Sequence, residues 1–135
     1  MADRLTTDTI IVHCSATPQN MDIGVEEIRR WHTDPKPRGK GWSDIGYHYV
    51  IRRSGVVEAG RDWKRMGAHA RGHNRTSIGI CLVGGNDAED RRRAEANYTR
   101  QQYRSLEKLI AEQYVLTGFS IKHVQIGRAS CRERV

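Results

Sequence analysis

The chain has 135 residues, of which 37% are hydrophobic and 29% are charged, and its net charge is +7. This length fits one compact domain, and no apolar run approaches the roughly 20 residues of a membrane-spanning helix. The positive charge favours an acidic partner such as nucleic acid, a membrane surface or a bacterial wall, and does not choose among them. Three cysteines are an odd number, which indicates thiols or metal ligands rather than a disulfide framework.

The N-terminus lacks the pattern of a signal peptide. Its apolar stretch is limited to residues 10–12, and Asp3 and Asp8 precede it. We therefore expect the protein to stay in the cytoplasm after synthesis.

The first half of the chain alternates between strand, helix and loop signals. Residues 9–14 (TIIVHC) are β-branched and apolar, which predicts a short buried strand. Val25, Ile28 and Trp31 recur at helical spacing, so a helix should begin near residues 22–24. The segment 33–41 contains two prolines and two glycines and is predicted to be a loop.

The middle of the chain predicts a hairpin and a second buried strand. Residues 46–52 and 56–60 form the two arms of the hairpin, with a turn at 53–55. Residues 61–76 are polar and contain several glycines, which indicates an irregular surface segment. SIGICLVGG, residues 77–85, reads as a strand ended by a glycine pair.

The last third predicts a charged loop over 87–97, a helix over 100–116 and a strand over 119–124. Thr99 is a good N-cap for the helix, and Gly118 should end it. One face of this helix carries an apolar stripe made by Tyr103, Leu106, Leu109, Ile110 and Tyr114. Strands interleaved with two helices predict an α/β fold: a single domain with a mixed β-sheet flanked by helices.

Residues 126–135 (IGRASCRERV) differ from the rest of the chain because they show no periodicity and carry three arginines against one glutamate. The string resembles the translation of a sequencing adapter. We therefore expect a domain over residues 1–125 and an atypical tail over 126–135.

Two histidines and a cysteine are candidate metal ligands. His13 lies inside an apolar strand, where an unsatisfied imidazole would cost about 1–3 kcal/mol. It is either a core histidine bonded to a backbone carbonyl or a metal ligand at a strand end. His123 and Cys131 are separated by seven residues, and together with His13 they would leave one position open, as in catalytic zinc sites. The spacing alone is a weak signal.

Three blocks, IIVHCSAT, GYHYVIRRSGVVEAGRD and GAHARGHNRTSIGICLVGG, give the sequence a family resemblance. In this order they resemble the N-acetylmuramoyl-L-alanine amidase family of phage lysozymes and peptidoglycan-recognition proteins. The likeness runs from about residue 7 to residue 124, so residues 1–125 are predicted to be an amidase-like domain. It implies a Zn²⁺ ion held by two histidines and one cysteine, which fall on His13, His123 and Cys131.

The resemblance also implies roles for other residues. The catalytic tyrosine falls on Tyr47, which would orient the attacking water or donate a hydrogen bond to the developing oxyanion. His69 and Asn74 match positions that line the substrate groove. His48, next to Tyr47, should face the other side of its strand and be structural.

The sequence departs from the family pattern near Cys131. Some members have a lysine two residues before the cysteine, where this chain has Ala129, and a proline after it, where this chain has Arg132. A C-terminal helix normally follows, whereas four residues remain here. Impaired catalysis and exposure of apolar surface are therefore expected consequences.

Two functions follow from the sequence. The first is a phage endolysin that hydrolyses the amide between N-acetylmuramic acid and L-alanine, held in the cytoplasm of the host bacterium until lysis. The alternative is a non-catalytic module that binds peptidoglycan or a protein partner, since one relative binds an RNA polymerase. No nucleic-acid motif or platform of interleaved aromatic residues is present, so nucleic acid is not an expected partner. A membrane is not an expected partner either. We expect a monomer.

Overall fold

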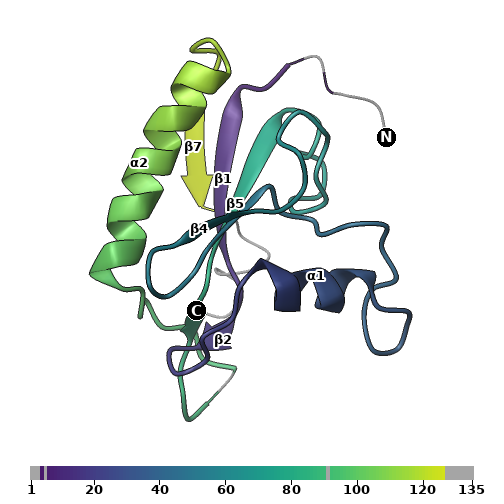
Figure 1. The fold of residues 1–135 in the computed structure, drawn as a ribbon, viewed down its shortest axis with the longest axis vertical. Helices are drawn as coiled ribbons and strands as arrows, with labels where there is room; N and C mark the ends of the chain where they lie inside the picture. The colour runs from purple at the N-terminus through teal and green to yellow at the C-terminus, as the bar shows by residue number, and fades with distance from the viewer. Residues whose placement is uncertain (1–3, 5, 91, 127–135) are drawn as a thin grey trace.

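The computed structural model describes residue 4, residues 6–90 and residues 92–126 (Figure 1). A mixed five-stranded sheet has the order β4-β3-β5-β1-β7, and only the β3–β4 pair is antiparallel. A two-stranded parallel ladder joins β2 to β6. The strands are β1 (Thr9–Cys14), β2 (Thr17–Pro18), β3 (Tyr49–Ile51), β4 (Val57–Ala59), β5 (Ser77–Leu82), β6 (Gly85–Asn86) and β7 (His123–Ile126).

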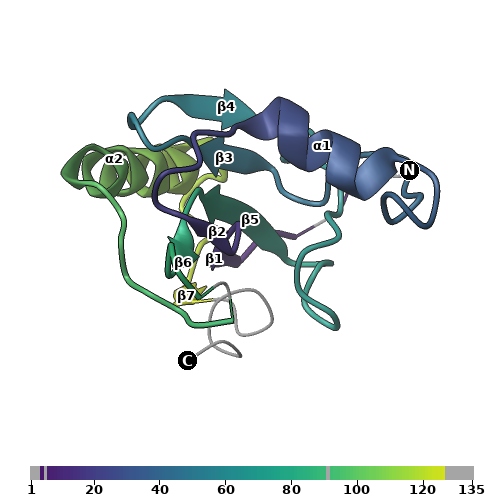
Figure 2. The same ribbon diagram turned by 90° about the horizontal axis from the view of Figure 1, so that it is seen from below.

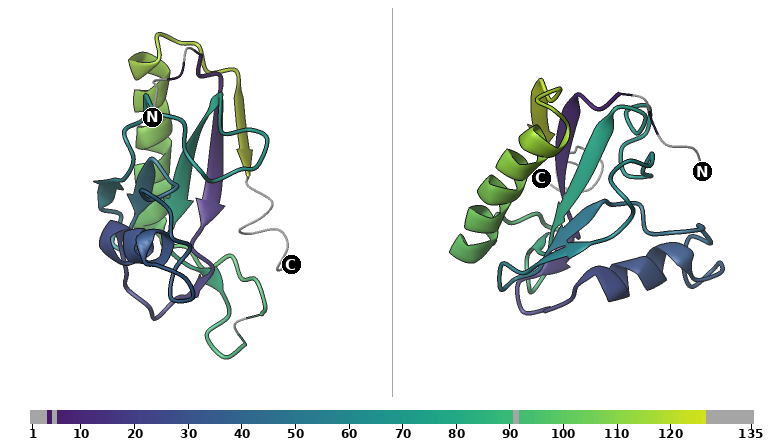
Figure 3. Two further views of the ribbon diagram at one scale, coloured as in Figure 1. Left: turned by 90° about the vertical axis from the view of Figure 1, so that its right-hand side faces the viewer. Right: turned by 45° about the horizontal axis from the view of Figure 1, so that its top comes forward.

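The two helices cover opposite faces of the sheet (Figures 2 and 3). Helix α2 (Arg100–Leu116) packs Leu109 against a cluster that includes Ile10 and Ile80, whereas α1 (Val25–Thr33) packs Ile28 against Val50 and Cys81. Every residue of the central strand β5 is buried, as expected for a parallel strand covered on both faces. The predicted fold class, a single α/β domain with a mixed sheet flanked by helices, is confirmed.

Helix α2 is fixed to the sheet by its first turn. The Thr99 hydroxyl accepts from the Gln102 N–H at 3.1 Å, and the Gln102 side chain accepts from the Thr99 N–H at 2.9 Å. This reciprocal cap satisfies two backbone donors that the helix cannot pair internally. The fully buried Gln102 amide also donates to the carbonyls of Ile51 and Val83, so the helix begins where β3 and β5 end. The N-cap predicted at Thr99 and the helix over 100–116 are confirmed.

The last strand is shifted from its predicted position. β7 begins at His123 rather than at residue 119, because Gly118 and Phe119 both have positive φ angles and carry the chain away from α2. The buried Ile121 then packs into the α2 cluster before the ladder begins. Ile126, the first residue of the tail predicted over 126–135, belongs to β7, and the remaining nine residues of that tail lie outside the described residues.

Two further strands are shorter than expected. The hairpin strands are only β3 and β4, although backbone bonds continue beyond them: the N–H groups of Gly60 and Arg61 donate to the carbonyls of His48 and Tyr47. The strand predicted over 77–85 stops at Leu82, and positive φ angles at Gly84 and Gly85 redirect the chain into β6. Among the described helices, neither is long and apolar enough to cross a membrane.

Candidate functional site

The candidate site lies at the end of β1, where three predicted residues meet. His13 is buried and pairs in register with Cys81 of β5. His69, from the irregular segment after β4, places its Nδ1 atom 2.9 Å from the Nε2 atom of His13. The ring centroid of Tyr47, just before β3, lies 5.3 Å from that of His13. Residues 56 positions apart in the sequence are thus in direct contact.

Hydrogen bonding assigns the proton positions in this pair. The Ser77 hydroxyl donates its single proton to the His73 carbonyl at 2.6 Å, so at 3.3 Å it accepts from Nε2 of His69. The Nδ1 atom of His69 is then an acceptor, and Nε2 of His13 is the donor. This assignment leaves the lone pair of the His13 ring on Nδ1.

Burial keeps both imidazoles neutral. It lowers the pKa of His13 from its ordinary value to about 4. Burial, reinforced by the neighbouring His13 and His48 rings, lowers the pKa of His69 to about 2. A neutral ring is the form that can bind a cation, so His13 keeps that capacity at neutral pH.

Two glycines and Asn74 set the position of His69. A Cβ atom at Gly79 would lie 2.5 Å from Cγ of His69, and one at Gly67 would lie 2.7 Å from its Cδ2, so both positions must lack a side chain. The Asn74 side-chain oxygen accepts from the backbone N–H groups of His69 and Ala70, each at 2.9 Å. The side-chain oxygen of Asn74 therefore holds the backbone segment that carries His69.

The segment before Tyr47 is held by two buried side chains that the sequence analysis did not identify. The Nδ1 atom of His32 accepts from the Gly46 N–H at 2.9 Å, and its ring centroid lies 5.6 Å from that of Tyr47. The buried Arg61 guanidinium donates to the carbonyls of Asp44, Ile45 and Met66. Neither residue has a sequence signal of its own, because its partners are backbone atoms of remote segments.

The Tyr47 hydroxyl donates to the Cys81 thiol sulfur. Sulfur is a weak acceptor, so this contact contributes little to holding the hydroxyl. His48, by contrast, is fully satisfied: its Nδ1 atom accepts from the Gly79 N–H at 2.9 Å, and its Nε2–H donates to the Arg65 carbonyl at 2.7 Å. The structure thus agrees with the structural role expected for His48.

The structure does not bring His123 to His13. In the β1–β7 ladder His123 pairs with Thr9, four residues before His13. Four residues of extended chain span about 13 Å. His123 is also exposed, whereas His13 is buried. Cys131 and Ala129 lie outside the described residues.

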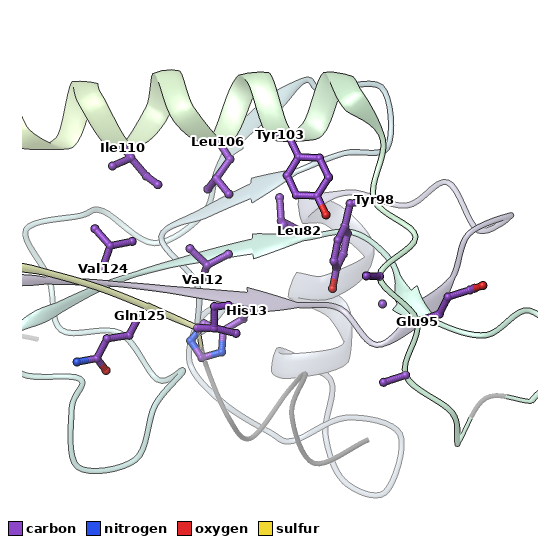
Figure 4. A pocket seen from close by; sticks show the side chains of 14 residues that line it. Val12, His13, Leu82, Glu95, Tyr98, Tyr103, Leu106, Ile110, Val124 and Gln125 are labelled. Carbon is purple, nitrogen blue, oxygen red and sulfur yellow. The ribbon is translucent and has the colours of Figure 1, made fainter. Parts of the chain in front are cut away.

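A pocket of about 660 Å³ adjoins His13 on the side of α2 (Figure 4). Val12 and Val124 point toward the helix in this view, while His13 and Gln125 point away from it. The lining is mostly apolar and includes Leu82, Tyr98, Tyr103, Leu106 and Ile110. Three apolar side chains there are exposed: Tyr103 by 46%, Val124 by 45% and Ile126 by 68%.

The side chains at this site can be tested as ligands for the implied zinc ion. His13 fits, because it is neutral and held at a strand end. His123 does not fit beside it, and the part of the chain that the structure describes contains no group of three or more His, Cys, Asp or Glu side chains able to hold a metal. Of the three predicted ligands, His13 and His123 lie apart, and Cys131 lies outside the described residues.

Comparisons with known proteins define the class. Residues 3–132 match the family model described as N-acetylmuramoyl-L-alanine amidase. The endolysin of Klebsiella phage KP32 is 51% identical over 109 residues, covering 81% of this chain and 68% of that protein. The endolysin of Escherichia phage T7 is 50% identical over 107 residues, covering 79% and 66%. The chain thus spans about two thirds of the length of these relatives.

Solved structures agree with this class. The N-acetylmuramoyl-L-alanine amidase LysC from Clostridium intestinale URNW superposes with a TM-score of 0.69 at 28% identity, covering 90% of this chain and 70% of that chain. Drosophila PGRP-LB shares the fold, with a TM-score of 0.73 at 24% identity over 92% of this chain and 72% of that chain. The fold is therefore that of the N-acetylmuramoyl-L-alanine amidases. The chain belongs to the N-acetylmuramoyl-L-alanine amidase family, a family of hydrolases.

Proposed function

We propose that the protein is a zinc-dependent endolysin that hydrolyses the amide between N-acetylmuramic acid and the L-alanine of the peptidoglycan stem peptide. The observation that carries this proposal is the contact of His13, His69 and Tyr47 at the end of β1 in a chain about 50% identical to phage endolysins. Water adds across the amide bond, leaving a carboxylate on the lactyl group and a free amine on L-alanine.

Each residue has a role in this proposal. His13 is a ligand for Zn²⁺, which when bound polarises an amide carbonyl and acidifies water. Tyr47 turns its hydroxyl from Cys81 to the amide oxygen as negative charge develops there. His69 lines the substrate groove and holds His13 through their hydrogen bond. Asn74 positions the backbone of His69.

The second candidate is a non-catalytic module that binds peptidoglycan. The separation of His123 from His13 along β1 favours it, because a site lacking ligands would bind the wall without cutting it. In either role the proposed partner is bacterial peptidoglycan, and the proposed location is the cytoplasm of the infected bacterium until lysis.

Digestion of purified peptidoglycan separates the two candidates. For the amidase we expect free L-alanine amino termini to appear without new reducing sugar ends. Chelation should stop this release, and added Zn²⁺ should restore it. Co-sedimentation with peptidoglycan without release of amino termini, at any zinc concentration, would favour the binding module instead.

A further inference from the structure

The register of β7 against β1 decides which β7 side chains can reach an ion bound to His13. The described ladder pairs Thr9 with His123, Ile11 with Gln125 and Val12 with Ile126. Residues paired in register point to the same face of a sheet, and that face alternates along each strand. His13 therefore shares its face with the side chains at positions 123 and 125, and faces away from those at 124 and 126.

Positions 123 and 125 differ in their distance from His13. His123 is four residues from the level of His13, about 13 Å along the strand, whereas zinc–nitrogen bonds are only about 2.0–2.1 Å long. Gln125 is two residues from that level, a diagonal separation of roughly 7–8 Å that long side chains span. Figure 4 shows Gln125 and His13 on the same side of the two strands.

We infer that His123 does not share a metal ion with His13. Among the described residues of β7, position 125 is the one from which a side chain could reach an ion bound to His13. Gln125 occupies that position with an amide, which is a poor ligand for zinc compared with imidazole. The inference rests on the proposed role of His13 as a zinc ligand. It concerns metal binding, so it can be tested without measuring catalysis.

The experiment is a zinc titration against a chromophoric chelator, performed on the full chain. We compare the unmodified protein with His13→Ala, His123→Ala and Gln125→His. His123 and Gln125 are both exposed, so neither substitution should disturb folding, and circular dichroism checks this. His13→Asn serves as a second variant of the buried position, in case alanine unfolds the chain.

We expect His123→Ala to leave the zinc dissociation constant within twofold of the unmodified protein, and Gln125→His to tighten zinc binding at least tenfold. The gain should disappear in Gln125→His combined with His13→Asn.

Two results would overturn the inference. The first is a His123→Ala variant that loses zinc affinity as strongly as His13→Ala. The second is a folded Gln125→His variant with no gain. Failure of the proposed amidase activity would appear separately, as absence of L-alanine amino termini, and would leave the zinc titration interpretable.

Discussion

The Nε2 atom of His13 lies 2.9 Å from the Nδ1 atom of His69, although His13 belongs to β1 and His69 to the irregular segment after β4. The contact requires β5 to lie beside β1 and to lack a side chain at Gly79, over which the His69 ring packs. A strand-end histidine is thus held by a loop histidine whose position depends on a glycine. The following predictions test this arrangement.

Tyr47→Phe should lower kcat by roughly 100- to 1,000-fold, because the hydroxyl is the proposed donor to the developing oxyanion. Tyr49→Phe is a matched control. Its hydroxyl oxygen accepts from the Gln113 amide, and the residue packs with the α2 cluster, on the other face of the sheet. This control should lose about 1 kcal/mol of unfolding free energy and keep its activity. Equal losses of kcat in both variants would exclude the specific role of Tyr47.

Gly79→Ala should displace His69, since the added Cβ would come within 2.5 Å of the imidazole. Overpacking of this kind costs about 1–3 kcal/mol, measured by urea unfolding. Combining it with His69→Ala removes the clashing ring, so the double variant should be less destabilised than the sum of the two single variants. Strict additivity would show that the ring and Gly79 do not interact.

Asn74→Ala should lower activity about tenfold, because the backbone N–H groups of His69 and Ala70 lose their acceptor and the loop is released. Asn74→Asp keeps an acceptor oxygen and removes only the amide nitrogen, so it should stay within about threefold of the unmodified protein. A tenfold difference corresponds to about 1.4 kcal/mol. If both variants raise KM equally, the amide nitrogen contacts substrate instead.

The metal-free protein should lose stability as the pH falls below about 6.5. Burial holds the pKa of His13, His32 and His48 near 4 in the folded protein, below the value in the unfolded chain. The unfolded state therefore takes up protons first. The stabilisation is complete above the unfolded pKa and declines toward pH 4, by up to about 1.4 kcal/mol per pH unit for each group.

Thermal unfolding midpoints between pH 8 and pH 4 measure this effect. His69→Gln should show a shallower decline, because one buried imidazole is removed. His123→Ala removes an exposed imidazole and should follow the unmodified protein. A decline equally shallow in both variants would contradict the assignment of the pH dependence to the buried histidines.

The sequence by itself determined the main elements and the class of protein. β-branched residues at 9–14 and the capped apolar stripe of 100–116 are local signals, and both elements form where they were predicted. Three ordered blocks of residues identified the family, which the comparisons confirm. Tyr47 and His13 could be singled out because their neighbours in the chain carry the family pattern.

Tertiary structure decided which of the candidate residues meet. The spacing between His123 and Cys131 says nothing about strand register, and the register places His123 beside Thr9. His32 and Arg61 support the Tyr47 segment through backbone atoms distant in sequence, so no local pattern reveals them. Local signals fix elements because they act within a few residues. Contacts between elements depend on register and packing, which only the folded chain sets.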